Sequence, residues 1–233
     1  MNCSPGSDQN PEAAEASQAD APALPEFLNP LPGAWVELQD RLRGPRVFSK
    51  HVTQVGRDAK NGCMVRIRNR QNDHLGWGLW HPRSTVALRL LTRSTDPLSL
   101  EQLRDRAVVA ARRRLLDPEI PEDVCRIVHA EGDGFPGLLI DRYSNVLAAE
   151  CHSRGSANLF EAILPALHDV LGTSHHRLVF DAKAARAEGD QTFEIRSTAC
   201  PKYLKIVEDG VRYEVDFAKS HKTGFFCDQS ENR

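Results

Sequence analysis

The stretch that decides the fold of the middle of this chain is Gly132–Tyr143, which reads GDGFPGLLIDRY. Its first six residues match the GxGxxG pattern of dinucleotide-binding proteins. In such proteins the glycines open a helix whose N-terminus faces a pyrophosphate. Here the apolar run Leu138–Ile140 follows, which is typical of a strand, and Pro136 lies inside the pattern. The sequence therefore predicts a hairpin turn at Gly132–Gly137 and no nucleotide site there.

Strands and helices are expected on both sides of this turn. Ser99 with Gln102 forms a capping box that predicts a helix, and Ser156–Leu171 has apolar residues at helical spacing before Gly172. Pro165 lies inside the second helix and favours a kink or a later start. Six strands are expected, of which the last two form a hairpin: Arg126–Ala130, Leu138–Asp141, Val146–Cys151, Arg177–Asp181, Tyr203–Val207 and Val211–Phe217.

The N-terminal third has two parts of opposite charge. Residues 1–33 hold five acids and no lysine or arginine, and they have too few large apolar side chains to fold, so we expect a disordered acidic tail. Residues 34–93 hold twelve lysines and arginines against four acids, a balance of +8. Short alternating strands such as Met64–Arg68 predict a small barrel there. A basic barrel in a nearly neutral chain is typical of a nucleic-acid binder.

The candidate RNA contacts lie in this barrel. The residues Arg66 and Arg68 share one face of a strand, and Gly76 and Gly78 flank a nearby aromatic ring. Basic groups beside aromatic rings suit phosphate contact and base stacking, although scattered arginines can also be a simple solvated face. The predicted RNA-binding residues are Arg46, Arg66, Arg68, Arg70, Trp77 and Trp80.

Other classes of site have weaker signals. The six cysteines form no CxxC pair, so we expect them to be reduced and the protein to be cytoplasmic. Neither Cys125 with His129 nor Cys151 with His152 has metal-ligand spacing, so no metal site is expected. No catalytic nucleophile is predicted, and no apolar run has the length of a membrane span.

Three motifs carry a resemblance that covers residues 34–233. They are the glycine-rich turn, the run Pro45–Ser49 (PRVFS) and the terminal block His221–Arg233 (HKTGFFCDQSENR). Together they resemble the bacterial 23S rRNA large-subunit methyltransferases that modify cytosine C5. One departure is Arg46, which stands where the family usually has tryptophan. The resemblance implies an α+β chain with three parts: an N-terminal PUA-like β-barrel at 34–93, a central strand-strand-helix-strand-strand domain at 94–199, and the opening β-hairpin of a Rossmann-like methyltransferase domain at 200–233.

The resemblance also implies a cofactor and partners. In a complete enzyme the S-adenosylmethionine pocket would include Thr223, Gly224, Phe226, Gln229 and Arg233, and the substrate would be ribosomal RNA. The cofactor loop and the catalytic cysteine of the family would follow Arg233, so we expect this chain alone to be inactive and to bind no cofactor. Two functions stay open: the RNA-binding and linker portion of a methyltransferase, or a stand-alone RNA-binding protein. The methyltransferase domain as a separate chain and a homodimer are both left open as partners.

Overall fold

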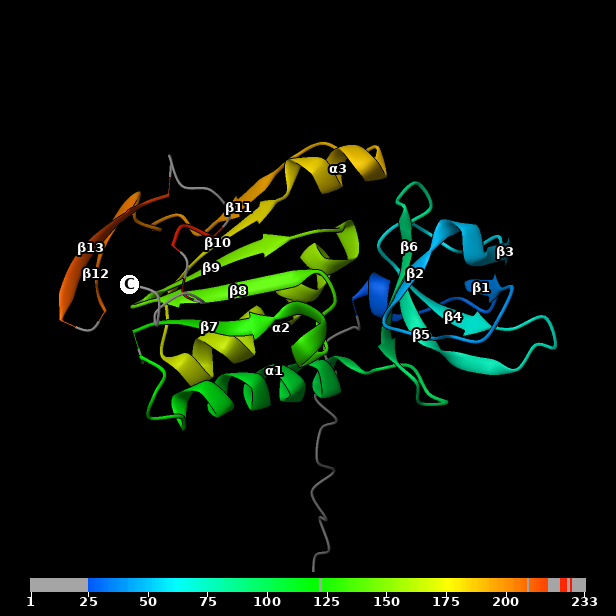
Figure 1. The fold of residues 1–233 in the computed structure, drawn as a ribbon, viewed down its shortest axis with the longest axis horizontal. Helices are drawn as coiled ribbons and strands as arrows, with labels where there is room; N and C mark the ends of the chain where they lie inside the picture. The colour runs from blue at the N-terminus through cyan, green and yellow to red at the C-terminus, as the bar shows by residue number, and fades with distance from the viewer. Residues whose placement is uncertain (1–24, 122, 209, 218–222, 226, 228–233) are drawn as a thin grey trace, which may run out of the picture.

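The computed structural model describes residues 25–121, 123–208, 210–217, 223–225 and 227. Most of the expected acidic tail, residues 1–24, lies outside the described residues. Along the longest axis of the molecule, a half-barrel is followed by a central sheet and then by a two-stranded hairpin (Figure 1). None of the described helices combines the length and the apolar character that crossing a membrane requires.

The half-barrel is one six-stranded sheet in the order β2-β6-β5-β4-β1-β3. Every neighbouring pair is antiparallel except β1 and β4, which are parallel. The 3-10 helix η1, Glu26–Leu28, precedes the half-barrel. The half-barrel consists of β1 Trp35–Leu38, β2 Arg46–Phe48, the 3-10 helix η2 Ser49–His51, β3 Val52–Val55, β4 Met64–Arg68, β5 His74–Trp80 and β6 Val86–Thr92.

Alternation along β4 sorts its side chains as the sequence predicts. Val65 and Ile67 are fully buried in the half-barrel core, while Arg66 and Arg68 are partly exposed on the other face. A strand with one buried face has a strongly specified register, because a shift of one residue would expose the apolar set. The two arginines are therefore held on the outer face.

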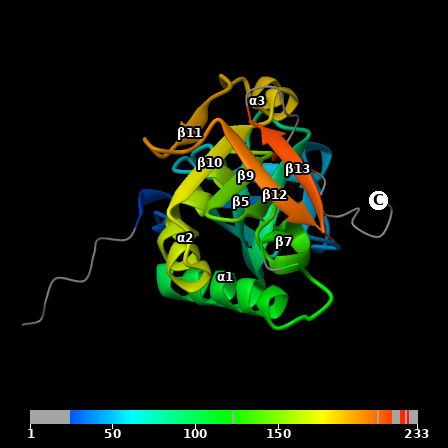
Figure 2. The same ribbon diagram turned by 90° about the vertical axis from the view of Figure 1, so that its left-hand side faces the viewer.

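The central domain is a five-stranded mixed sheet in the order β11-β10-β9-β8-β7, with α1 and α2 covering one face (Figures 1 and 2). Its elements are α1 Leu100–Leu115, β7 Val124–His129, η3 Ala130–Asp133, β8 Leu138–Tyr143, β9 Val146–Cys151, α2 Arg154–Leu171, β10 His175–Phe180, α3 Ala182–Glu188 and β11 Glu194–Arg196. The predicted order strand-strand-helix-strand-strand is therefore incomplete. The predicted order has two strands before α2, whereas the structure has three, β7, β8 and β9. The predicted order also omits the short helix α3, whose seven residues are too few for a periodic apolar signal.

Both long helices begin at capping boxes. Ser99 caps α1 with Gln102, as predicted, and Ser153 caps α2 with Ser156. The helix α2 begins at Arg154, two residues before the predicted start at Ser156. This start was not predicted, because Ser156 stands where the usual capping box has glutamate or glutamine. Pro165 lies inside α2, which continues to Leu171 and ends at the left-handed Gly172.

The glycine-rich stretch is a hairpin turn, as predicted. It joins the antiparallel strands β7 and β8, and Gly134 and Gly137 have φ angles of +77° and +75°. Such angles favour glycine, because a side chain there clashes with the backbone. The turn is tied to α1 by Asp133, which accepts hydrogen bonds from Arg114 at 2.7 and 2.8 Å. Burial raises the pKa of Asp133, but the hydrogen bonds from Arg114 and the His129 backbone, together with the charges of Arg114 and Arg113, outweigh it, and the net pKa is lowered.

One hydrophobic core joins the half-barrel to the central domain. Met64, Leu79 and Leu91 of the half-barrel lie in the same buried cluster as Leu103 and Ile127 of the central domain. A Cβ on Gly155 would lie 2.9 Å from the Leu79 side chain, so the start of α2 lies directly on β5. The position of the half-barrel surface relative to the central domain is thus fixed by packing.

The hairpin β12 Tyr203–Glu208 and β13 Val211–Asp216 lies at the end of the central sheet away from the half-barrel (Figure 1). Its inner face, with Ile206 and Val215, packs against Val124 and Tyr143. The sequence predicted this hairpin and its turn. The five described cysteines are free, as expected for a reduced protein: Cys63, Cys125, Cys151, Cys200 and Cys227.

Candidate nucleic-acid interface

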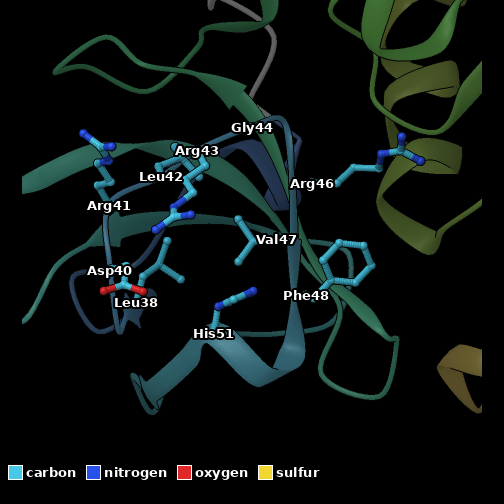
Figure 3. A pocket seen from close by; sticks show the side chains of 10 residues that line it. All are labelled: Leu38, Asp40, Arg41, Leu42, Arg43, Gly44, Arg46, Val47, Phe48 and His51. Atoms are coloured by element: carbon cyan, nitrogen blue, oxygen red, sulfur yellow. The ribbon is translucent and has the colours of Figure 1, made fainter.

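A basic pocket of about 300 Å³ opens on the half-barrel (Figure 3). Its basic side chains are the guanidinium groups of Arg41, Arg43 and Arg46 and the imidazole of His51, and Asp40 is the one acid among its lining residues. The remaining lining residues are Leu38, Leu42, Gly44, Val47 and Phe48. The pocket therefore combines positive charge with an apolar floor.

The topology of the half-barrel explains the position of this pocket. It lies where the end of β1, the loop 39–45, the edge strand β2 and η2 come together. The backbone N–H of Gln39 donates to the His51 carbonyl at 2.9 Å, and Arg93 donates to the Leu42 carbonyl at 3.3 Å. These bonds hold the loop over the buried core, while the Arg41 and Arg43 side chains remain exposed.

An exposed aromatic ring lies at the rim of the pocket. Phe48 is 44% exposed, whereas the residue before it, Val47, is buried. An exposed ring beside guanidinium groups can stack on a base while the cations bind the phosphates. The pocket thus has the chemistry required for a flexible or single-stranded segment of nucleic acid.

Arg46 lies between this pocket and a second one. Its side chain is 60% exposed and turns toward the central domain, where it lies 3.9 Å from Glu131 (Figure 3). The second pocket has a volume of about 410 Å³ and includes Arg46, Arg89, Glu131 and His152. The predicted contact Arg46 is therefore placed where the two domains meet.

Arg66, Arg68 and Trp77 form a separate patch, divided from the basic pocket by strands of the sheet. Arg66 pairs with Trp77 across β4 and β5, which agrees with the predicted nearness of this arginine to an aromatic ring. Arg68 already makes two contacts within the half-barrel: its guanidinium lies 3.4 Å from the centre of the Trp35 ring and 3.3 Å from the Glu37 carboxylate. The patch can still present Arg66 and the half-buried Trp77 to a ligand.

The other two predicted RNA contacts differ in exposure. Arg70 is exposed in the turn after β4. Trp80 is 6% exposed and lies in the half-barrel core, so it offers almost no ring surface to a base. Alternation along β5 explains this, because Trp77 and Trp80 are three residues apart on one strand and therefore face opposite sides of the sheet.

The described part of the terminal block packs on the central domain. Thr223 is 2% exposed, and its hydroxyl donates to Asp141 Oδ2 at 2.5 Å. The Phe225 N–H donates to the Tyr143 hydroxyl at 3.0 Å, and this hydroxyl donates to the Phe225 carbonyl at 2.9 Å. Gly224 is half-buried. Phe226, Gln229 and Arg233, the other predicted cofactor residues, lie outside the described residues.

Asp141 is the centre of this contact. It is fully buried and accepts hydrogen bonds from Arg126 at 2.8 and 3.1 Å as well as from Thr223. A buried carboxylate requires such partners, because its transfer from water to the protein interior costs roughly several kcal/mol of free energy. Burial also raises the pKa values of Tyr143 and Cys227, so both stay protonated at neutral pH. The arrangement stabilises the fold and has the character of a docking contact.

Sequence reasoning did not single out Arg41, Arg43 or His51 as site residues. The available signal was local: Arg41, Arg43 and Arg46 lie within six residues that also contain Gly44 and Pro45, a composition typical of an exposed basic loop. Their convergence with His51 depends on the path of the chain through β2 and η2.

Comparisons with known proteins agree with these observations. A family model described as a PUA-like domain matches residues 40–93, which include most of the basic pocket. The ribosomal RNA large subunit methyltransferase I of Photobacterium profundum is 29% identical over 207 residues, which are 83% of this chain and 50% of the relative. The ribosomal RNA large subunit methyltransferase of Deinococcus radiodurans is 31% identical over 212 residues, which are 84% of this chain and 51% of the relative. This chain thus spans about half the length of the curated relatives that it matches.

Two solved structures share the fold. One is described as "a putative sam-dependent methyltransferase from Streptococcus mutans"; it has a TM-score of 0.65 at 14% identity and is matched over 85% of this chain and 52% of its own. A second structure, described as a methyltransferase in similar terms and complexed with SAH, has a TM-score of 0.63 at 15% identity and covers 85% of this chain. At such identities the likeness shows the fold alone.

Proposed function

Because this chain is related to the ribosomal RNA large subunit methyltransferases and carries a PUA-like domain, we propose that it is the RNA-binding and linker part of an S-adenosylmethionine-dependent rRNA methyltransferase. The target is proposed to be cytosine C5 of 23S rRNA, from the motif resemblance described above. The observation that carries the proposal is the basic pocket of the half-barrel, which lies largely within the PUA-like match.

The basic pocket suits RNA for physical reasons. Phosphate contacts by arginine supply most of the sequence-independent affinity of a nucleic-acid binder. The exposed Phe48 ring adds a stacking surface, and every base has a face that can stack. Because one hydrophobic core joins the half-barrel to the central domain, RNA bound at the pocket has a fixed position relative to the rest of the chain.

The cofactor belongs to the complete enzyme in this proposal. There, Thr223, Gly224, Phe226, Gln229 and Arg233 would lie at the S-adenosylmethionine pocket. The packing of Thr223 and Phe225 on Asp141 and Tyr143 supports a linker role, because it anchors the start of this block on the central domain. The central domain would then hold the RNA-binding and cofactor-binding parts at a fixed separation.

The test is the salt dependence of RNA binding. Replacing Arg41 and Arg43 with alanine removes two exposed cations from the pocket. Each lost phosphate contact lowers the slope of log affinity against log salt by about 0.7–0.9. We therefore expect the slope for a structured rRNA fragment, measured by fluorescence anisotropy, to flatten by up to about 1.8.

A matched control removes two arginines elsewhere. Arg112 on α1 and Arg186 on α3 are exposed and lie outside both pockets, so their double alanine variant has the same net charge as the pocket variant. It should bind RNA with nearly the slope of the parent chain. The Arg66→Ala, Arg68→Ala variant examines the second patch in the same way. Equal slopes in all variants would show that RNA does not bind this half-barrel.

A further inference from the structure

Two carboxylates and an imidazole converge at one edge of the central sheet. Glu150 lies near the end of β9, His152 follows that strand, and Asp181 follows β10. One ligand atom from each of the three lies within 4.8 Å of the other two. Because β9 and β10 are parallel neighbours, their carboxyl ends bring residues that are 30 positions apart in the sequence to the same edge.

The backbone holds each of these residues in place. The N–H of His152 donates to the Gly137 carbonyl at 2.8 Å, and the N–H of Asp181 donates to the Cys151 carbonyl at 3.0 Å. Asp181 Oδ1 also accepts from the Ala184 N–H at 2.7 Å, which caps α3. The three side chains therefore project from rigid elements, as a preorganised ligand set requires.

Glu150 is the unusual member of this cluster. It is 5% exposed, and its Oε1 lies 3.6 Å from His152 Nε2. Its other oxygen, Oε2, is buried and has no hydrogen-bond partner among the described residues. An ionised carboxylate in that position is costly unless a cation compensates it. This orphaned oxygen is an observation separate from the clustering, and it points to an absent positive charge.

We propose that Glu150, His152 and Asp181 form a binding site for a divalent first-row transition metal ion of the Mn²⁺ or Zn²⁺ kind. The ion would bind carboxylate oxygens of Glu150 and Asp181 and the Nε2 atom of His152. Imidazole with carboxylates suits Mn²⁺ and Zn²⁺, whereas Mg²⁺ and Ca²⁺ favour sets made only of oxygens. Three protein ligands leave coordination positions for water.

The surroundings of the cluster are consistent with a cation that solvent can reach. His152 is 37% exposed in its side chain and lines the pocket between the two domains. Arg154, two residues after His152, is paired with Asp190 at 2.5 and 2.8 Å and lies over the Phe193 ring. Cys151 is fully buried in the hydrophobic core, so its thiol is not a competing ligand.

The experiment measures Mn²⁺ binding to the full 233-residue chain. Mn²⁺ is preferred as the probe because the cysteines bind it weakly compared with Zn²⁺. Loss of the free-ion spectrum in electron paramagnetic resonance gives the stoichiometry, and the thermal midpoint reports the linked stabilisation. We expect one saturable site, a rise of the midpoint with Mn²⁺, and little effect of Mg²⁺ at the same concentration.

Glu150→Gln is the decisive variant because it has two opposite effects. It should weaken Mn²⁺ binding by at least about tenfold, since even groups that only orient a ligand contribute about 10- to 100-fold. In EDTA, the same variant should have a higher thermal midpoint than the parent chain, because it removes an uncompensated buried charge. His152→Ala, at a more exposed position, should also weaken Mn²⁺ binding and provides a second variant if the first does not fold.

Two neighbouring residues of the same pocket are the controls. Glu131→Gln and His129→Ala change a carboxylate and an imidazole that line this pocket but lie outside the cluster. Both should keep the Mn²⁺ affinity of the parent chain. The proposal is overturned if no saturable site is found, or if the control variants lower the affinity as much as Glu150→Gln does.

Discussion

Replacing Thr223 with valine tests whether the terminal block is docked on the central domain. The change keeps the shape of the side chain and removes the hydroxyl that donates to the buried Asp141. A hydrogen bond to a charged group contributes about 1.5–3 kcal/mol to stability. Arg126 still pairs with Asp141 in this variant, so the larger penalty for an uncompensated buried charge is avoided. For a chain of this size, the loss corresponds to a fall of about 3–12 °C in the melting midpoint.

The measurement is thermal and urea unfolding of the parent and variant chains. Thr53→Val is the matched control, because the Thr53 hydroxyl donates to a glutamate carboxylate, Glu37 Oε1, at 2.9 Å, but from an exposed position. Glu37 is buried, but it keeps its ion pair with Arg68 in this variant and water can reach the exposed position 53, so the change should stay within about 0.5 kcal/mol. If Thr223→Val costs no more than Thr53→Val, the hydroxyl of Thr223 does not anchor the terminal block, and the linker role proposed for it loses its support.

Two further predictions concern the cofactor and the buried thiols. S-adenosylmethionine should give no heat of binding with this 233-residue chain in calorimetry, because the chain spans about half the length of the methyltransferases that it matches and holds only the Thr223–Arg233 part of the predicted cofactor pocket; micromolar binding would refute this. Burial raises the pKa of Cys125 from 9.0 to about 11, so between these values the unfolded chain releases a proton that the folded chain keeps. The contribution of this thiol to stability is therefore complete below about pH 9 and is lost as the pH rises toward 11. In urea unfolding, Cys125→Ala should make that fall of stability shallower. A variant with the same pH profile as the parent chain would contradict this prediction.

Local patterns determined much of the architecture. Alternation placed Val65 and Ile67 inside and Arg66 and Arg68 outside, and the capping box placed the start of α1. The strand after Gly137 distinguished a hairpin turn from a nucleotide loop. These features depend on residues a few positions apart, so the chain itself carries the whole signal. The strands β1, β2 and β11 were missed because three or four residues span at most two periods, and α3 was missed because its seven residues contain no large apolar side chain.

The contact of the terminal block and the proposed metal site depended on the tertiary structure, because each joins residues that are remote in sequence. Thr223 bonds to Asp141 across 82 positions, and Asp181 meets Glu150 through the parallel pairing of β9 and β10. Trp80 shows the converse case: it is three residues from Trp77 on the same strand, so local alternation places it on the opposite face, in the core, and the prediction of Trp80 as an RNA contact was wrong. Composition determined that the half-barrel is basic. The arginines of the pocket are close along the chain, and the path of the chain through β2 and η2 decided that His51 and the apolar floor join them.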